Sequence, residues 1–270
     1  MAMSKVVLIT GASSGLGKTT AERLASKGYV VYGTSRRKQQ ETLPNLHFIV
    51  MDVCDRASVR EGVAEVLRRE GRIDVLVNNA GMGISGALEL ATDDEIDCQM
   101  NTNFRGCVLV CQEVLPTMRG QGRGQIINLS SIGGVMGLPY QGFYSASKFA
   151  IEGFTEALAA EVKGFGIKVS MVEPGDFATN FTAQRRISDA TTRSEAYGKS
   201  FTRTMSLIEK EENSGLHPDK LARTVERIIR SRHPRLRYVV ANLVQHLSVV
   251  VKQIVPGNWM VAILRLFYKV

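Results

Sequence analysis

The side chains that most often build metal sites and disulfides are scarce in this 270-residue chain. It contains four histidines and four cysteines, and the cysteines are Cys54, Cys98, Cys107 and Cys111. Cys107 and Cys111 are one helical turn apart, but no second pair completes a tetrahedral ligand set. We therefore predict no bound metal and four buried, reduced thiols.

Long apolar runs are also few. The N-terminal sequence MAMSKVVLITG has a short apolar run before its glycine, which is too short for a signal peptide and predicts a strand. The segment 244–270 is strongly apolar but is broken at Pro256–Gly257, so 257–270 is shorter than the roughly 20 residues that cross a bilayer. We expect a cytoplasmic protein. Its 257–270 tail packs on the body or on a partner subunit, covers the substrate, or attaches peripherally to a membrane.

Acidic residues are sparse only in the last third of the chain. Residues 1–180 hold 18 Lys and Arg against 19 Asp and Glu, a net charge of −1, whereas residues 181–270 hold 16 against 7, a net charge of +9. No aromatic stacking platform accompanies this positive charge, so we predict no nucleic-acid binding. Solvated helix faces or an anionic surface such as lipid explain the excess better.

Short apolar segments alternate with helical patterns through the first 175 residues. The predicted strands are 5–10, 29–35, 46–52, 73–79, 124–131 and 167–174, and the helical patterns are 16–27, 56–70, 93–119 and 143–164. The strands are nearly continuously apolar, which is typical of a parallel sheet covered on both faces. We predict an α/β fold: a single doubly wound Rossmann-type domain with a mostly parallel central sheet of about seven strands, plus a C-terminal helical substrate lid or tail.

This single domain is expected to span residues 1–270. Residues 1–175 would form the cofactor-binding and catalytic core, and the largely polar residues 176–215 would form a substrate loop without regular periodicity. Residues 216–270 would supply C-terminal helices and, at 236–243, a last strand.

The glycine-rich motif TGASSGLG, residues 10–17, lies between the first predicted strand and the first predicted helix. Gly11 permits a tight turn, and Gly15 and Gly17 allow a pyrophosphate to approach the backbone closely. The unpaired N–H groups and positive dipole end of the helix would then face the phosphates. A turn without a ligand is the alternative interpretation.

The end of the second predicted strand indicates which dinucleotide is bound. An NAD site has an acidic residue here for the ribose hydroxyls, but this chain reads Ser35-Arg36-Arg37-Lys38. Guanidinium groups can bind a 2′-phosphate through two hydrogen bonds, so we predict NADP(H), with Arg36 as the first contact and Arg37 as the second. An ordinary basic surface turn is the alternative.

A tyrosine and a lysine stand four residues apart in the stretch YSASK. Tyr144 and Lys148 share one helix face, and an ammonium beside a phenol lowers the phenol pKa from about 10. The tyrosine could then exchange a proton with a carbonyl or an alcohol oxygen near neutral pH. Ser131 ends the fifth predicted strand, at the edge of the sheet where ligands bind in such folds.

Six motifs occur in an order that is found in one known family. They are TGASSGLG (10–17), NNAG (78–81), NTNFRG (101–106), NLSS (128–131), YSASK (144–148) and PGDFAT (174–179). Through these motifs the sequence resembles the short-chain dehydrogenase/reductase family over residues 4 to about 180. Within that family it most resembles the 17-beta-hydroxysteroid and retinol dehydrogenases.

The resemblance implies a role for each matching position. Ser131 would orient the substrate oxygen, Tyr144 would be the acid/base, and Lys148 would hold the nicotinamide ribose and lower the Tyr144 pKa. Asn103 would lie at a break in the fourth helix and position a water. The implied cofactor contacts, which include those predicted above, are Gly11, Ser13, Ser14, Gly15, Leu16, Gly17, Arg36, Arg37, Asp52, Val53, Asn78, Asn79, Ala80, Gly81, Tyr144, Lys148, Pro174, Gly175, Phe177 and Thr179.

The substrate side of the site is expected to be apolar. Candidate substrate contacts besides Ser131 are Met82, Met136 and Phe181, and further candidates for the cavity wall are Ile84, Phe177, Met205 and Leu207. Routine core packing is the alternative for each of them. An apolar site would suit a steroid, a retinoid, a long-chain acyl group or another lipid carbonyl.

Together these features predict an NADP(H)-dependent oxidoreductase that interconverts a ketone or aldehyde and an alcohol on a small hydrophobic substrate by hydride transfer. A 3-oxoacyl thioester reductase is one alternative, and a non-catalytic NADP-binding regulator is another. The resemblance also implies a homodimer or homotetramer built on the helices that carry Asn103 and Tyr144.

Overall fold

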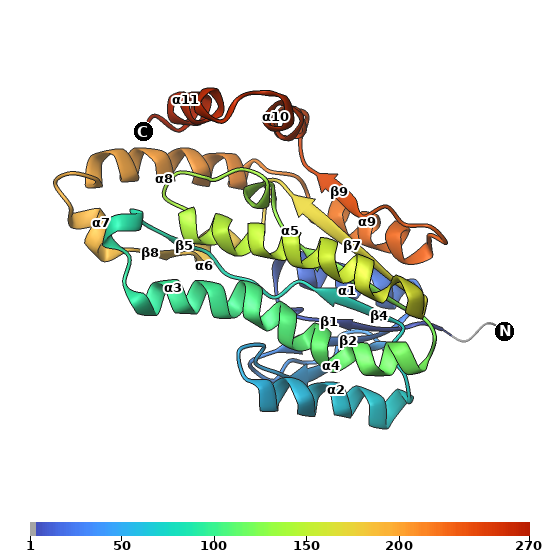
Figure 1. The fold of residues 1–270 in the computed structure, drawn as a ribbon. Helices are drawn as coiled ribbons and strands as arrows, with labels where there is room; N and C mark the ends of the chain where they lie inside the picture. The colour runs from blue at the N-terminus through green and yellow to red at the C-terminus, as the bar shows by residue number, and fades with distance from the viewer. Residues whose placement is uncertain (1–3) are drawn as a thin grey trace.

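A seven-stranded parallel sheet forms the centre of the computed structural model, which describes residues 4–270 (Figure 1). The strand order is β3-β2-β1-β4-β6-β7-β9. The strands are β1 (Val6–Ile9), β2 (Val30–Ser35), β3 (Leu46–Val50), β4 (Val75–Asn78), β6 (Gly124–Leu129), β7 (Ile167–Pro174) and β9 (Arg237–Val240). This arrangement confirms the predicted fold class and the number of strands. The first part of the motif MAMSKVVLITG lies outside the described residues.

The strand order reverses between β1 and β4. The chain adds β2 and β3 on one side of β1, and then β4, β6, β7 and β9 on the other side, with all pairings parallel. A crevice forms at the carboxyl ends of the strands wherever the order of an open sheet reverses in this way. The glycine-rich loop follows β1 and the NNAG motif follows β4, so both lie at this point.

Helices cover both faces of the sheet and bury its two sides. On one face, α2 (Arg56–Glu70), α4 (Gly106–Gly120) and α5 (Gly142–Val162) pack on β-strand residues such as Leu8 and Leu76. On the other face, α1 (Gly15–Ser26) and α9 (Asp219–Arg230) bury the opposite sides of the same strands.

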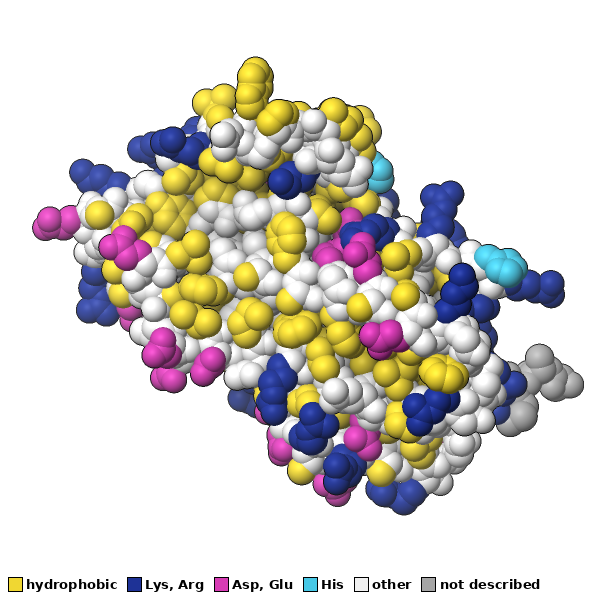
Figure 2. Space-filling model, viewed as in Figure 1, with side chains coloured by type: hydrophobic (Ala, Val, Ile, Leu, Met, Phe, Trp, Pro, Cys, Tyr) yellow, Lys and Arg dark blue, Asp and Glu magenta, His cyan; other side chains and the backbone are white. Residues whose placement is uncertain are grey.

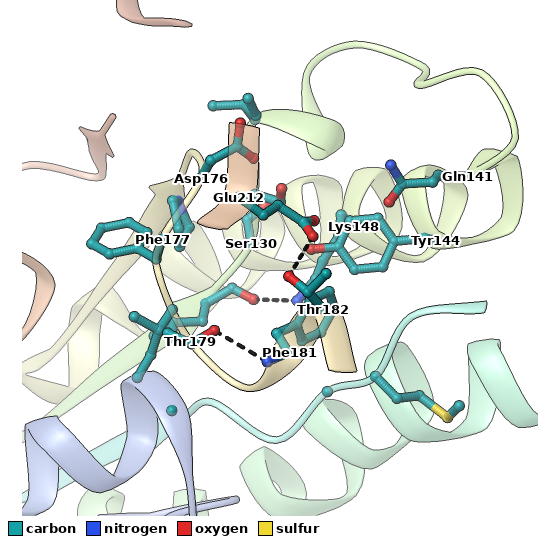
Figure 3. A pocket seen from close by; sticks show the side chains of 18 of the residues that line it. Ser130, Gln141, Tyr144, Lys148, Asp176, Phe177, Thr179, Phe181, Thr182 and Glu212 are labelled. Atoms are coloured by element: carbon teal, nitrogen blue, oxygen red, sulfur yellow. Dashed lines mark hydrogen bonds between the residues drawn. The ribbon is translucent and has the colours of Figure 1, made fainter. Parts of the chain in front are cut away.

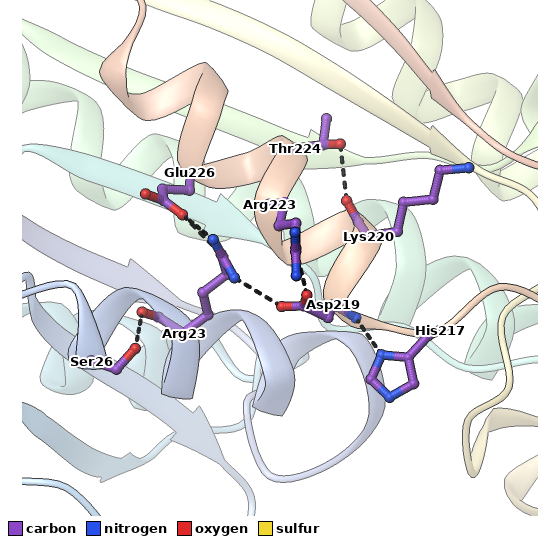
Figure 4. A network of polar contacts seen from close by, with 8 residues as sticks. All are labelled: Arg23, Ser26, His217, Asp219, Lys220, Arg223, Thr224 and Glu226. Atoms are coloured by element: carbon purple, nitrogen blue, oxygen red, sulfur yellow. Dashed lines mark hydrogen bonds and ion pairs between the residues drawn. The ribbon is translucent and has the colours of Figure 1, made fainter.

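Ion pairs join α1 to α9 at the edge of the second layer. Arg23 of α1 contacts Asp219 at 3.0 Å and Glu226 at 2.7 Å, both on α9 (Figure 4). Arg23 therefore links a helix from the first strand–helix unit to a helix that lies 196 residues further along the chain.

The helix predicted over 93–119 has a break at its centre. It consists of α3 (Asp93–Met100), a π-helical turn at Asn101–Arg105, and α4. Thr92 begins α3 with a capping box, because its hydroxyl accepts from the Glu95 amide and the Glu95 carboxylate accepts from the Thr92 amide. The break falls at Asn103, where the resemblance implied it.

The segment predicted as a substrate loop, 176–215, is instead largely helical. It contains α6 (Phe181–Gln184), a two-residue strand β8 (Arg186–Ile187) that pairs with β5 (Ile84–Ser85), α7 (Asp189–Arg193) and α8 (Gly198–Asn213). The prediction of a loop was wrong for α8, because its few apolar residues, Phe201, Met205 and Ile208, are spaced for one buried face among mostly polar neighbours.

Two further helices end the chain. They are α10 (Leu243–Ile254) and α11 (Gly257–Tyr268), separated at Pro256 as the sequence predicted. In Figure 1 they lie together on the outside of the molecule, above α8 and β9. The described residues also form three short 3₁₀ helices. Leu88–Leu90 and Ile132–Gly134 lie in loops, and Lys163–Phe165 directly follows α5.

Candidate active site

A cavity of about 850 Å³ opens at the carboxyl edge of the sheet. Its walls come from the loops after β1, β2, β3, β4, β6 and β7 and from the two C-terminal helices. The glycine-rich loop and Ser131 line this cavity together with Tyr144 and Lys148, which point toward the same space (Figure 3 shows Tyr144 and Lys148). The structure therefore brings the predicted cofactor motif and the predicted catalytic residues to one site.

Close backbone packing explains the glycines of the loop. Gly11 and Gly15 have positive φ values of 66° and 53°. A Cβ on Gly17 would lie 2.3 Å from the carbonyl oxygen of Gly11 and 2.3 Å from the side-chain nitrogen of Asn79. The Asn79 side chain donates to the carbonyls of Thr10 and Gly11 at 2.8 and 2.9 Å, so it fixes the loop after β1 to the loop after β4.

The start of α1 is arranged to accept an anion. Ser14 is its N-cap residue, yet among residues 4–270 its side chain makes no capping hydrogen bond, and the first turn holds no acidic residue. The free amides of this turn line the cavity, and backbone N–H groups at a helix N-terminus favour phosphate. The residues therefore fit the diphosphate of a dinucleotide.

The residues after β2 and β3 fit the other end of a dinucleotide. Arg36, Asp52 and Val53 line the cavity, and the Asp52 carboxylate accepts from the Cys54 amide at 2.9 Å. Arg37 lies outside the cavity lining and is exposed. Of the two predicted arginines, Arg36 lines the cavity and Arg37 does not.

Tyr144 and Lys148 both project from the first turns of α5 into the cavity. The Lys148 ammonium nitrogen lies 5.7 Å from the centre of the Tyr144 ring and donates to the Leu129 carbonyl at 2.9 Å. Ser131 follows β6 and is buried, and its hydroxyl accepts from the Gly133 amide at 3.0 Å. The hydroxyls of Ser131 and Tyr144 lie next to each other in the cavity lining.

The Tyr144 pKa is raised in this structure, so the predicted net lowering of this pKa is wrong. Burial raises the pKa of the Tyr144 hydroxyl above 10, the hydrogen bond with Ser131 lowers it, and the nearby charge of Glu212 raises it. Burial also lowers the pKa of Lys148 to about 8. Burial is the largest cause of both shifts, and in each case it disfavours the charged form of the group.

Asn103 is fully buried in the π-helical turn and holds the loop after β4. Its side chain accepts from the Met82 amide at 2.8 Å and donates to the Met82 carbonyl and to Ser147, each at 3.0 Å. One turn earlier, Gln99 also donates to the Met82 carbonyl, at 2.8 Å. Asn103 therefore positions the Gly81–Met82 backbone, which lines the cavity beside Lys148.

Not every predicted site residue reaches the cavity. The Asn78 side chain lies between β6 and α4, where its nitrogen donates to Asn128 of β6 at 3.0 Å and to the Cys111 sulfur of α4 at 3.1 Å, so it is a core residue and not a pocket residue. Ile84, Met205 and Leu207 also lie outside the cavity lining, and Ile84 and Met205 are buried in the protein core. The remaining predicted positions line the cavity: Gly11, Ser13, Ser14, Gly15, Leu16, Gly17, Asn79, Ala80, Gly81, Met82, Met136, Pro174, Gly175, Phe177, Thr179 and Phe181.

Two groups of lining residues were missed by sequence reasoning. The first is acidic: Asp176, Glu211 and Glu212 face the substrate side of the cavity. Glu212 pairs with Arg185 and accepts from Thr182 at 2.6 Å, and Asp176 accepts from Gln245. Burial and the charge of Glu212 raise the pKa of Asp176 to about 6.

The second missed group is apolar and comes from the end of the chain. It consists of Val244, Met260, Ile263, Leu264, Phe267 and Tyr268. These side chains close the cavity opposite the sheet, and the Tyr268 carbonyl accepts from Thr204 of α8 at 2.9 Å. Two of the three predictions for the tail agree with this placement, because the tail packs on the body through Met260 and also covers the cavity.

The chain matches the family model described as short chain dehydrogenase over residues 5–190. It therefore belongs to the short-chain dehydrogenase/reductase family, as its motifs predicted. This membership makes the protein an oxidoreductase that acts on CH–OH and keto groups with a nicotinamide dinucleotide, NAD(H) or NADP(H).

Relatives match most of the chain. The 3-ketodihydrosphingosine reductase of Bacteroides thetaiotaomicron is 54% identical over 266 residues, which are 98% of this chain and 98% of that protein. Human 17-beta-hydroxysteroid dehydrogenase type 1 is 41% identical over 191 residues, 65% of this chain and 58% of that protein, in agreement with the predicted branch. The crystal structure of a short-chain dehydrogenase from Streptomyces avermitilis has a TM-score of 0.82 at 33% identity and covers 96% of this chain and 98% of its own.

Two further observations concern metals and membranes. Within residues 4–270, no three His, Cys, Asp or Glu side chains come together in a group that could hold a metal ion. In the same part of the chain, every helix is too short or too polar to cross a bilayer.

Proposed function

We propose that this protein is an NADPH-dependent reductase of a long-chain lipid ketone, with a 3-keto long-chain base as its preferred substrate. The observation that carries the proposal is the 54% identity to a 3-ketodihydrosphingosine reductase along 98% of both chains. A cavity of about 850 Å³ with an apolar roof supports it, because an aliphatic chain needs such a surface.

In this proposal the substrate oxygen lies between the hydroxyls of Ser131 and Tyr144. The bound nicotinamide supplies the hydride that the carbonyl carbon receives. Tyr144 holds its proton, since its pKa is raised, and donates it to the oxygen, so that the ketone becomes a secondary alcohol. The Lys148 ammonium stabilises the phenolate that is left until solvent returns a proton.

A preference for NADP(H) over NAD(H) is also part of the proposal. Arg36 lines the cavity directly after β2, where an enzyme specific for NAD would carry a carboxylate. We expect Arg36→Leu to raise the KM for NADPH at least about tenfold while leaving the KM for NADH within twofold, since one charge-assisted phosphate contact is lost. Equal effects on both cofactors would contradict the assignment.

The acidic side chains on the substrate side help to choose among substrates. Asp176 and Glu212 would repel the phosphate groups that accompany acyl thioesters, and they suit the ammonium group of a long-chain base. Steroids and retinoids offer no cation to these groups. The 3-oxoacyl thioester, steroid and retinoid alternatives are therefore less favoured, and so is a non-catalytic regulator, because Ser131, Tyr144 and Lys148 share the cavity.

We also propose that the protein works in the cytoplasm as a homodimer or homotetramer through α4 and α5. Phe149 supports this surface, because it is a large apolar side chain of α5 that is 45% exposed. Light scattering coupled to size exclusion would test it, and a monomer at micromolar concentration would refute it.

A substrate panel tests the proposed reaction. NADPH consumption is measured with 3-ketodihydrosphingosine, oestrone, retinal and a 3-oxoacyl thioester, and Tyr144→Phe serves as the control. We expect the highest kcat/KM for the long-chain base and a loss of about 10²–10⁴-fold in kcat for Tyr144→Phe with unchanged NADPH binding. A higher kcat/KM for any other member of the panel would replace the proposed substrate, and full activity of Tyr144→Phe would refute the mechanism.

A further inference from the structure

The helices α10 and α11, called here the roof helices (residues 243–270), expose most of the large apolar side chains on the surface. Sixteen large hydrophobic residues are exposed among the described residues, and eleven of them lie in this segment. They are Leu243, Val244, Leu247, Val250, Ile254, Trp259, Val261, Ile263, Leu266, Phe267 and Val270. Figure 2 shows hydrophobic side chains gathered at the top of the view, over these helices. An exposed apolar patch of this kind on a protein surface marks a binding face.

The inner side of the roof helices is attached to the catalytic domain. Val249 and Met260 are buried and pack with Ile132 and Met136 of the loop after β6. The roof helices are therefore held in place over the active site, and their outer apolar residues are not needed for this attachment.

The mouth of the cavity opens onto the exposed apolar surface. Val244, Ile263 and Phe267 line the cavity, and they are also 69%, 46% and 52% exposed to solvent. Residues that are shared by a cavity wall and by the outer surface mark the rim of an opening. An aliphatic chain could pass this rim without leaving an apolar environment.

The charge around the roof helices is of one sign. Residues 231–270 contain six Lys and Arg and no Asp or Glu. Arg265 and Lys269 are exposed on α11, and Lys252 is half-buried on α10. This combination suits an interfacial helix on an anionic bilayer, because basic side chains attract the headgroups while the apolar side chains enter the acyl boundary. A second copy of the chain would bring its own positive charges against those of this face, and the two copies would repel each other.

We propose that the roof helices dock the protein peripherally on an anionic lipid bilayer, with the mouth of the cavity facing the lipid. A lipid substrate then exchanges between the bilayer and the cavity along the rim formed by Val244, Ile263 and Phe267. This inference goes beyond the proposed function, because it concerns the surface from which the substrate arrives and not the reaction.

Vesicle co-sedimentation of the full-length protein tests the docking. The vesicles are phosphatidylcholine alone or phosphatidylcholine mixed with phosphatidylglycerol. The variant Trp259→Asp with Leu266→Asp removes two apolar side chains that are 70% and 83% exposed and that lie outside the cavity lining. The matched control, Leu88→Asp with Phe165→Asp, removes two that are 57% and 46% exposed elsewhere.

We expect the wild type and the control to bind the anionic vesicles, and to bind neutral vesicles more weakly. The roof variant should bind the anionic vesicles at least about tenfold more weakly, because two large apolar side chains no longer enter the lipid. Its kcat/KM should fall by a similar factor for a lipid ketone embedded in vesicles, and should stay within twofold for a short, water-soluble ketone.

Several results would overturn the docking proposal. They are wild-type protein that does not sediment with anionic vesicles, equal binding to neutral vesicles, and a roof variant that binds as well as the control. Dissociation of an oligomer in the roof variant, without vesicle binding by the wild type, would instead assign this face to self-association. Turnover of the water-soluble ketone separates these results from a failure of the proposed reaction.

Discussion

Arg237 attaches the last strand of the sheet through three carboxylates, and its removal gives a quantitative test of the fold beneath the roof helices. Its guanidinium contacts Glu173 at 2.8 Å, Glu156 at 2.6 Å, and Glu152. Glu173 and Glu152 are only 1% and 5% exposed. Arg237→Met would keep most of the side-chain packing but leave two buried carboxylates without their cation.

Removing one partner of a buried ion pair costs about 3–5 kcal/mol. The Arg237 side chain is 38% exposed, so solvent screens part of the interaction and we expect a loss of about 2–4 kcal/mol at pH 8. For a chain of this size the melting temperature should fall by roughly 5–12 °C. Because β9 leads directly into α10, part of the loss should appear as loosening of the roof helices.

The loss should depend on pH through Glu152. Burial raises the pKa of Glu152 from 4.5 to about 6, against the opposing effects of the nearby Ser130 hydroxyl and the charge of Arg237. A carboxyl whose pKa is higher in the folded state stabilises the fold below its unfolded pKa, and this contribution is lost as pH rises through the folded value. Arg237→Met raises the folded pKa further, so the variant should regain stability as pH falls from about 6 to 4.5.

Urea unfolding followed by circular dichroism at pH 8 and at pH 5 measures both effects. Arg230→Met is the matched control, since Arg230 is 73% exposed and pairs with Glu226 at 3.6 Å, so its removal should cost less than about 1 kcal/mol. A difference below about 1 kcal/mol between Arg237→Met and wild type at pH 8, or one that is equal at both pH values, would refute the reasoning.

Three further predictions concern the active site. Gly17→Ala places a Cβ 2.3 Å from a backbone carbonyl oxygen, so we expect NADPH affinity in a fluorescence titration to fall at least about tenfold; Gly120→Ala, whose Cβ would meet no described atom within 4 Å, should leave it unchanged. Asp176→Asn removes a charge that raises the pKa of Tyr144, so the pH profile of alcohol oxidation by NADP⁺ should move to lower pH, and an unmoved profile would contradict this. Burial lowers the pKa of Lys148 to about 8, so the rate of reduction by the wild type should decline as pH rises through about 8. Lys148→Met should have a lower kcat without this decline. If the decline persists in Lys148→Met, it is caused by another group.

The sheet and the dinucleotide loop could be predicted from the sequence because their signals are local. Each strand is a short apolar run, and the glycines of residues 10–17 follow the first of them directly. The order of the remaining motifs then placed Ser131, Tyr144 and Lys148 at the same edge of the sheet. Contacts between distant parts of the chain are not needed to explain where Ser131, Tyr144 and Lys148 lie.

The substrate side could not be predicted in the same way, because it is assembled from distant parts of the chain. Phe267 and Tyr268 reach the cavity only because β9 pairs with β7 and turns the tail back over the site. Glu211 and Glu212 stand in a polar stretch that is typical of a solvated helix face. Their neighbour Ile208 is one of few apolar residues that reveal which side of α8 is buried.

The error in the Tyr144 pKa has a different origin. The spacing of Tyr144 and Lys148 correctly predicts that they share a helix face, and attraction alone would lower the phenol pKa. The spacing carries no information on how deeply the two groups are buried. In the folded protein the loss of hydration acts on both groups and reverses the direction of the shift.

Because of the π-helical turn at Asn101–Arg105, the number of residues between α3 and α4 is as important as the identity of those residues. A π turn is a widened helical turn that holds one additional residue. Deleting one residue here would restore an unbroken α-helix and remove the widened turn in which Asn103 lies. Gln99 and Asn103 would then lose the spacing with which both of them now bind the Met82 backbone. A single-codon deletion at this position should therefore inactivate the enzyme even if every catalytic side chain is retained.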